Sequence, residues 1–242
     1  MWRDDLRGIY CITLKDMRTY YLKPPAISWG IVFPVTWILA FYLRNPGDFS
    51  ELVPGLVGMT ILFSTTAAEA VVINFELRIG SLERLLLAPI TVEAVLLGKI
   101  VGGALFGLLM TAIVTASSIL GVGLHINLLC LLLILVPSIF CFSAMGALMS
   151  VLVEQVFEAQ TLANLPRFVM VFLSGVVYPI SAMPLLLQYV AALMPLTYTV
   201  EGLRHAFSSD PGCTPLTDSI VIVAFLVVFI FPAARLLRRR FT

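Results

Sequence analysis

The chain has 242 residues, of which 60% are hydrophobic and only 12% are charged, and its mean hydropathy is +1.03. A water-soluble domain carries about 25% charged residues and lacks the interior to bury this much apolar surface. The composition therefore excludes a soluble enzyme and predicts an all-α membrane protein, and the net charge of +1 gives no sign of a nucleic-acid partner.

Residues 3–22 are predicted to form an amphipathic helix that lies along the membrane surface. Apolar side chains recur at helical spacing over one arc of this segment, while Asp5 and Asp16 lie elsewhere on it. The alternative is a cytosolic helix that packs against the rest of the protein. Pro24 and Pro25 end the helix and turn the chain into the bilayer.

Six apolar stretches follow, each long enough to cross a bilayer core roughly 30 Å thick. The predicted spans, which together make one transmembrane domain over residues 1–242, are 26–43, 52–73, 92–120, 128–153, 162–178 and 219–237. Pro34 is predicted to kink the first span, and Arg167 is expected near the start of the fifth.

The third span contains Gly98, Gly102, Gly103 and Gly107, which give two overlapping small-xxx-small spacings. This pattern is typical of helices that pack closely in membranes, and we favour that interpretation over a ligand-binding role.

Residues 179–207 are apolar, but Pro179, Pro184 and Pro195 interrupt them. We expect short re-entrant helices in the outer leaflet, between the fifth and sixth spans, because irregular backbone in a membrane needs cover from protein or water.

The basic residues predict the orientation. If both termini are cytosolic, all 15 Lys and Arg residues except Arg44 and Arg204 lie inside or at the inner span edges, as the positive-inside rule requires. A seventh span at 180–200 would place the C-terminal arginines outside. The chain is therefore predicted to be a multi-pass protein of the cell (plasma or inner) membrane with both termini in the cytosol.

The polar stretch between the second and third spans predicts a short cytosolic helix. Ser81 is suited to cap its start, and Pro89 ends it. Its apolar residues Leu82, Leu85 and Leu86 share one face, with Glu83 and Arg84 exposed. Such an element is either a knob that fits a groove on a partner protein or an ordinary loop helix packed on the membrane surface.

Two motifs resemble those of ABC-2-type transporter permeases, the transmembrane subunits of ABC exporters of the drug-resistance and polysaccharide-export kind. The family's cytosolic loop runs roughly E-R-E-x-G-T-L-E-x-L-L-x-x-P before a Gly-Lys pair. This chain matches it at Glu76, Arg78, Gly80, Ser81, Leu82, Glu83, Leu85, Leu86, Pro89, Gly98 and Lys99. The second motif is the series Ser174-Gly175, Tyr178-Pro179, Pro184, Pro195-Leu196-Thr197-Tyr198 and Glu201-Gly202-Leu203-Arg204.

The resemblance implies a complex and assigns roles to these residues. Two permease subunits, identical or related, would face each other, and two cytosolic ATP-binding cassette subunits would dock beneath them and bind ATP and Mg. The helix that couples the permease to the ATPase would comprise Gly80, Ser81, Leu82, Glu83, Arg84, Leu85, Leu86 and Pro89. Glu76 and Arg78 would fix the base of this loop. An outer cap would comprise Ser174, Gly175, Tyr178, Pro179, Pro184, Pro195, Tyr198, Glu201 and Arg204.

Two polar residues, one in the second span and one directly after it, are candidates for a transport pathway. An ionisable group such as Glu69 is unfavourable in a membrane unless it pairs with an opposite charge or is in contact with water. It therefore either lines the cytosolic opening or, as we favour, snorkels or pairs with a nearby basic residue. Asn74 is the second candidate. Outside the membrane, Glu201 and Arg204 are expected to form a local ion pair.

The sequence lacks a GxxxxGK[ST] phosphate loop, an HExxH motif and a paired Cys/His metal set. We therefore expect no catalytic residues, no metal and no bound cofactor on this chain. The leading hypothesis is a permease subunit of an ATP-driven exporter for a hydrophobic or lipid-linked substrate, either a drug-like molecule or a glycan. The alternatives are an ion-coupled carrier or channel that works without an ATPase, suggested by Glu69, and a membrane assembly factor.

Overall fold

The computed structural model describes residues 2–44, 49–86, 88, 90–122, 126–208 and 214–241. Within these ranges the chain is helical and contains no strand. Those of its helices that are long and apolar enough to cross a membrane are α4 (Phe49–Arg78), α6 (Val92–Val122), α7 (Leu128–Leu152) and α11 (Thr214–Phe241). The predicted class, an all-α membrane protein, is confirmed, with four candidate spans.

The first predicted span is an irregular helix. It is preceded by α1 (Trp2–Asp16) and the π-helical turn η1 (Met17–Tyr21). The span itself consists of α2 (Pro24–Ile27), a second π-helical turn, η2 (Ser28–Val32), and α3 (Phe33–Arg44). The turn η2 ends two residues before Pro34, which cannot donate a helical hydrogen bond, so the predicted distortion takes this form.

The fifth predicted span is shifted along the sequence. It was expected over 162–178, whereas α8 runs over Val156–Leu173. The helix stops earlier because Gly175 adopts a φ of +76°, a left-handed conformation that ends helices. As a result Arg167 lies well inside α8 and not near its start. The 3-10 turn η4 (Ile180–Ala182), α9 (Leu185–Ala192) and α10 (Pro195–Ala206) follow.

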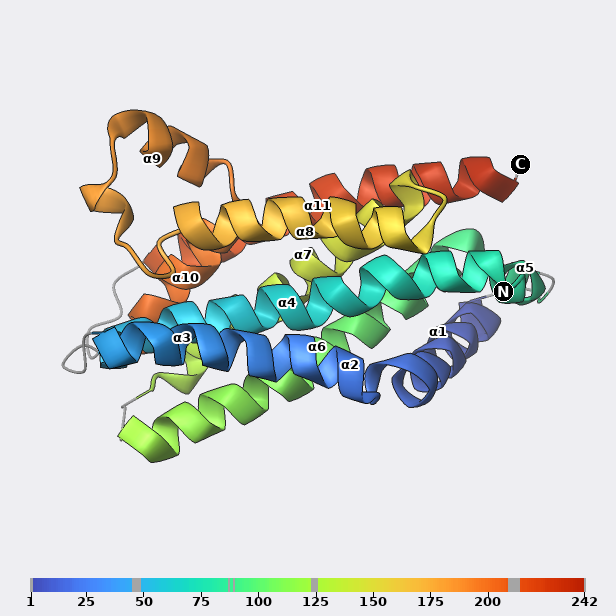
Figure 1. The fold of residues 1–242 in the computed structure, drawn as a ribbon. Coiled ribbons are helices and arrows are strands. Elements are labelled where there is room, and N and C mark those ends of the chain that lie inside the picture. Colours follow the sequence, from blue (N-terminus) through green and yellow to red (C-terminus); the bar gives the residue numbers. More distant parts are fainter. Residues whose placement is uncertain are drawn as a thin grey trace.

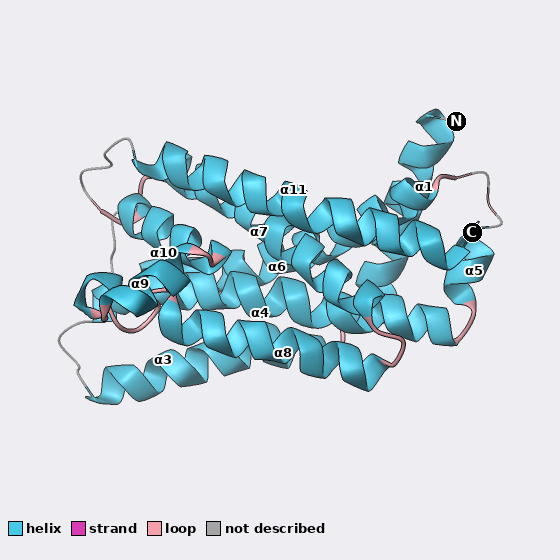
Figure 2. Ribbon diagram, turned by 90° about the horizontal axis from the view of Figure 1, so that it is seen from above, coloured by secondary structure: helices cyan, strands magenta, loops and turns pink. Residues whose placement is uncertain are grey.

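The helices form an elongated bundle with two different ends. Figure 1 and Figure 2 both place α5 (Ser81–Leu86) and the two ends of the chain at one end of the bundle, with α9 and α10 at the other. The short helices that the sequence places on opposite sides of the membrane are therefore at opposite ends of the fold.

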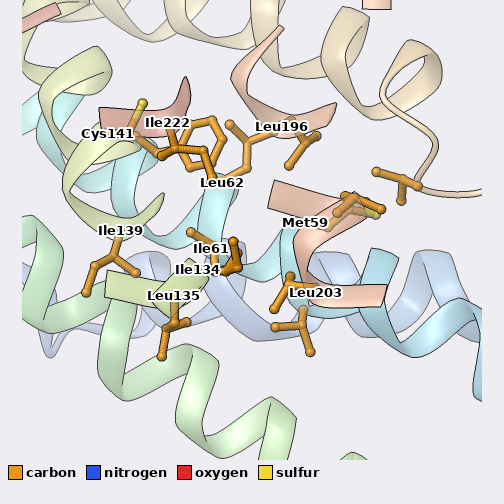
Figure 3. Close-up of a cluster of buried hydrophobic side chains, with 14 of the residues drawn as sticks. Met59, Ile61, Leu62, Ile134, Leu135, Ile139, Cys141, Leu196, Leu203 and Ile222 are labelled. Atoms are coloured by element: carbon orange, nitrogen blue, oxygen red, sulfur yellow. The ribbon is translucent and has the colours of Figure 1, made fainter. Parts of the chain in front are cut away.

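The largest apolar core joins α4, α7, α10 and α11. Figure 3 shows part of it, where Leu62 of α4, Ile134 of α7, Leu203 of α10 and Ile222 of α11 lie close together, each with 0% of its surface exposed. This core fixes α10 against the bundle, because Leu196, Val200 and Leu203 lie on one face of that short amphipathic helix.

The glycines of α6 lie where other helices approach closely, as predicted. A Cβ on Gly98 would lie 3.1 Å from Ile12 of α1, and one on Gly102 would lie 3.2 Å from the Tyr21 ring. The other pair faces α4, where a Cβ on Gly107 would lie 2.2 Å from the Thr65 methyl group. Each small-xxx-small spacing thus receives a different neighbour.

The N-terminal helix α1 combines the two predicted arrangements. One face packs on α6 through Ile12, which is 2% exposed. The opposite stripe, Trp2, Leu6, Tyr10 and Leu14, is exposed at four-residue spacing. The helix is therefore packed on the protein and still presents an apolar face outward.

Candidate functional site

The helix α5 begins at a sharp turn at the end of α4. Gly80 has a φ of +69°, which a residue with a side chain rarely adopts, and its carbonyl accepts a hydrogen bond from the Arg84 N–H. Ser81 does not cap the helix as predicted. It is the first residue of α5, and its hydroxyl has no hydrogen-bond partner among the described residues.

The apolar face of α5 points into the bundle. Leu82 is 1% exposed and belongs to a buried cluster with Ile73 of α4 and Leu96 of α6, and Leu85 packs against the same cluster. Of the two arrangements that the sequence left open, a knob for a partner's groove therefore does not hold for Leu82, which anchors α5 to its own chain. The side chains of Glu83 and Leu86, and Pro89 as a whole, lie outside the described residues.

In and around α5, the exposed residues include Ile79, which is 52% exposed, and Arg84 and Ala88. Arg78, the last residue of α4, is also exposed. A surface of two arginines and one isoleucine can offer a partner both charge-assisted hydrogen bonds and a small apolar contact.

The start of α6 is fastened to α1. The Asp5 carboxylate accepts a hydrogen bond of 2.9 Å from the Thr91 N–H, directly before α6. Further along, the Thr13 hydroxyl donates to the Gly98 carbonyl at 2.9 Å. Because α5 leads into this junction, a movement of α5 would be transmitted to α1 as well as to α6.

A buried charge cluster joins α1, α4 and α6 just above α5. The Lys99 ammonium group lies 2.8 Å from the Asp16 carboxylate and 2.6 Å from the Glu76 carboxylate, and Lys15 pairs with both acids. Lys99 is 1% exposed, and Asp16 and Glu76 are 0% exposed. Burial raises the pKa of the Asp16 carboxyl, and the nearby Lys99 charge opposes that rise.

This cluster changes the interpretation of two residues. Glu76 does belong to the base of the loop, but as a buried anion in the last turns of α4. Asp16 lies off the outward apolar stripe of its helix, as expected, and the structure adds that it faces the protein and not water. It is buried because it meets Lys99 of α6 at the point where Gly98 and Gly102 allow α1 to approach.

Glu69 is buried, and its hydrogen-bond donors are a hydroxyl and a backbone N–H. It is 0% exposed, and among the described residues no salt bridge involves it. The Tyr21 hydroxyl donates to its carboxylate at 2.6 Å, and the Gly103 N–H does so at 3.1 Å. Burial raises the pKa of Tyr21 well above its ordinary value, so the hydroxyl stays protonated and remains a donor. The favoured pairing with a basic residue is therefore wrong.

Asn74 and Arg167 also join helices within the chain. The Asn74 amide donates to the Ser150 carbonyl of α7 at 2.7 Å. The Arg167 guanidinium of α8 is 0% exposed and donates to the Thr66 hydroxyl of α4 at 2.5 Å and to Asn164 at 2.8 Å. In the single chain, Glu69 and Asn74 thus lie between helices and are not exposed.

At the opposite end of the bundle, the three prolines predicted for the outer cap each begin an element. Pro179 precedes η4, Pro184 precedes α9 and Pro195 is the first residue of α10. The Tyr198 hydroxyl donates to the Ala192 carbonyl at 2.8 Å and so ties α10 to α9. This end is therefore a connected set of short helices.

The expected ion pair at this end is absent. Arg204 donates to the Gly175 carbonyl at 2.6 Å, and within the described part of the chain no salt bridge joins it to Glu201. The left-handed turn at Gly175 exposes a carbonyl that Arg204 can reach. The neighbouring Ser174 is buried with its hydroxyl 3.7 Å from the Met194 sulfur, and Tyr178 is exposed.

The sequence reasoning missed Lys15, Lys99, Asp16 and Arg167 as members of buried polar contacts. A signal existed for Lys99 and Arg167, because a basic residue within an apolar stretch is unfavourable unless it is buried and hydrogen-bonded in the protein. No signal in a single sequence could have paired Asp16 with Lys99.

The fold and this site define a helical membrane protein with a short helix fastened beneath a set of apolar helices. The chain belongs to the ABC-2 type transporter family, whose model matches residues 7–208. It is therefore the membrane subunit of an ABC transporter, as the resemblance of its motifs predicted.

Curated relatives in bacteria agree with this assignment. The inner membrane transport permease YadH of Escherichia coli K12 is 27% identical over 229 residues, covering 90% of this chain and 87% of the relative. The probable multidrug ABC transporter permease YbhS of the same strain is 26% identical over 203 residues, covering 81% of this chain and 54% of the relative. Nodulation protein J of Sinorhizobium fredii is 28% identical over 162 residues, covering 65% of this chain and 61% of the relative.

Proposed function

We propose that the chain is the permease subunit of an ATP-driven exporter. In this assembly two permease chains, identical or related, face each other, and two ATP-binding cassette subunits bind ATP and Mg and dock at the end that carries α5. The observation that carries the proposal is the turn at Gly80, which holds α5 at the exposed end of α4 and directly beneath the cluster of Lys99, Asp16 and Glu76.

In this proposal the chain crosses the membrane six times with both termini in the cytosol. The arrangement supports it, because α5 and both termini share one end of the bundle (Figure 1), as an even number of crossings requires. The two crossings beyond the four candidate spans are the irregular helix from Pro24 to Arg44 and α8. The second of these exposes large apolar side chains such as Phe157 and Leu165.

The coupling step uses both faces of α5. Its buried face, with Leu82 and Leu85, transmits force to α4 and α6, and its exposed face, with Arg84, contacts the ATPase. The cluster above it ties α1, α4 and α6 into one unit, so that a displacement of α5 moves all three helices together.

The proposed outer cap is the short-helix end of the bundle. Leu185, Leu186 and Tyr189 of α9, and Leu193 directly after it, are each more than 70% exposed, which suits a helix that lies in the outer leaflet as a re-entrant element. The substrate we propose is a hydrophobic or lipid-linked molecule, drug-like or glycan. The apolar faces of the spans and the multidrug description of the relative YbhS support this class.

Co-purification with the cognate ATPase tests the assignment of the coupling helix. Arg84→Glu should abolish association and ATPase stimulation, because it reverses the charge on the exposed face of α5 without disturbing Leu82. Arg235→Glu, at an exposed position on α11, is the matched control and should leave both unchanged.

Normal ATPase association of the Arg84→Glu variant would show that α5 is not the docking element. Transport by the purified chain alone in liposomes, without ATP, would support the ion-coupled carrier or channel instead.

A further inference from the structure

The arginine of α8 is buried, and the part of the chain that the structure describes gives it no counter-ion. Arg167 is 0% exposed, and within the described residues neither Asp nor Glu forms a salt bridge with it. Its Nε donates to Thr66 and its Nη1 donates to Asn164, both of them neutral groups, and its Nη2 has no partner among the described residues. Arginine stays charged in proteins, so the fold buries a positive charge with an unused donor.

The position of this charge along the helix is unusual. Arg167 is the twelfth residue of the 18 in α8, so it lies about 16 Å from the start of the helix at a rise of 1.5 Å per residue. If α8 crosses a core roughly 30 Å thick, the guanidinium is near its middle. A charge at that depth is unfavourable by several kcal/mol unless it is satisfied, and such residues commonly mark a functional site.

An aromatic cluster lies beside Arg167. It consists of Phe33 and Trp37 of α3, Phe63 of α4, and Phe168 and Phe172 of α8. The guanidinium carbon of Arg167 lies 5.8 Å from the centre of the Phe63 ring. The cluster therefore provides an apolar surface next to the charge.

The aromatic cluster also separates the arginine from the outside. Figure 2 shows α3 along one edge of the bundle, with α8 next to it and in front of α4. Rings join these two helices, with Phe33 6.1 Å from Phe168 and Trp37 5.4 Å from Phe172, while Phe172 remains 57% exposed. Side-chain rotation is fast and needs no movement of the backbone, so a ligand from the bilayer can reach Arg167 between these rings.

We propose that Arg167 binds the anionic group of an amphiphile, a carboxylate or phosphate, while the apolar part of that molecule lies against the aromatic cluster. The fork of a guanidinium suits both oxyanions. Because the site lies near the middle of the membrane, its ligand is a molecule whose charge crosses the bilayer. The identification of this ligand as the exported substrate rests on the proposed export function; the binding site itself does not.

Tryptophan fluorescence gives a direct test on the full-length permease alone in nanodiscs. The chain has three tryptophans, so Trp2→Phe and Trp29→Phe leave Trp37, in the aromatic cluster, as the reporter. Dibrominated stearate, ionised at alkaline pH, is compared with its uncharged methyl ester. The ionised probe should quench Trp37 at about tenfold lower concentration, as expected for one hydrogen bond to a charged group.

The variants compare two arginines that each lie near a phenylalanine ring, the buried Arg167 and the exposed Arg235. Arg167→Gln should remove the preference for the ionised probe, and Arg167→Lys should retain part of it. The control is Arg235→Gln, whose arginine lies 5.7 Å from the Phe231 ring but is exposed, and it should retain the full preference.

Equal quenching by the two probes in the parent chain would overturn the proposal, and this comparison needs no variant of Arg167. A preference that survives in a folded Arg167→Gln chain would also overturn it, as would complete displacement of the probe by inorganic phosphate, which has no apolar part. Failure of the ATPase to associate would count against the proposed function alone, because binding is measured without the ATPase.

Discussion

Replacing Lys99 with methionine removes the central cation of the cluster that joins α1, α4 and α6. Methionine is unbranched like lysine but one atom shorter and uncharged, so Asp16 and Glu76 lose the ammonium group 2.8 and 2.6 Å away. Both carboxylates are fully buried, and only the partly exposed Lys15 remains to balance them. Breaking a buried ion pair by removal of one partner is unfavourable by about 3–5 kcal/mol, so we expect a loss of unfolding free energy of that size.

The free energy of unfolding is measured by titration with sodium dodecyl sulfate in mixed micelles. Lys23→Met, at an exposed lysine between η1 and α2, is the control and should change the free energy of unfolding by no more than about 0.5 kcal/mol. Adding Asp16→Asn to Lys99→Met restores a neutral cluster of Lys15 and Glu76, so it should recover at least half of the loss. Equal stabilities of the Lys99→Met and Lys23→Met chains would refute the reasoning.

Three further substitutions test other contacts. Gly103→Val should lower the melting temperature in detergent and the free energy of unfolding by about 1–3 kcal/mol, because a Cβ there would lie 2.6 Å from the Glu69 carboxylate. Tyr21→Phe should lower that free energy by about 1 kcal/mol, the usual range for a hydrogen bond between membrane helices, and a value equal to the parent's would contradict the assigned bond. Gly80→Ala should leave the melting temperature of the permease almost unchanged but reduce ATPase stimulation, since about 1–2 kcal/mol of left-handed strain at φ +69° would displace α5.

The sequence was sufficient for the helical class and for several local features. The apolar runs predicted the long helices, the glycines of α6 predicted close approach by neighbouring helices, and Pro34 predicted a distortion that appears as a π-helical turn. These features depend on residues near one another in the chain. Hydrophobic periodicity and the special backbone properties of Gly and Pro report on such local structure directly.

The contacts between distant residues could not be predicted in the same way. Asp16 and Lys99 are 83 positions apart, and Arg167 and Thr66 are 101 positions apart. Glu69 was assigned a basic partner from its chemistry, yet the fold supplies a tyrosine hydroxyl and a backbone N–H. Local pattern shows that a buried polar group needs a partner, but only the packing of the helices determines which partner it has.

Helix α4 takes part in several of the polar contacts between elements of the bundle. Along this helix, Thr66 bonds to α8 and Asn74 bonds to α7. Glu69 bonds to η1 and α6, and Glu76 pairs with lysines of α1 and α6. Such bonds resist sliding of α4 against its neighbours more than apolar contacts do, since sliding would leave buried donors and acceptors unpaired. A force applied at α5 would therefore move α4 together with the helices bonded to it, and the more mobile surface would be the one between α3 and α8, where the rings of Phe33 and Phe168 and of Trp37 and Phe172 meet.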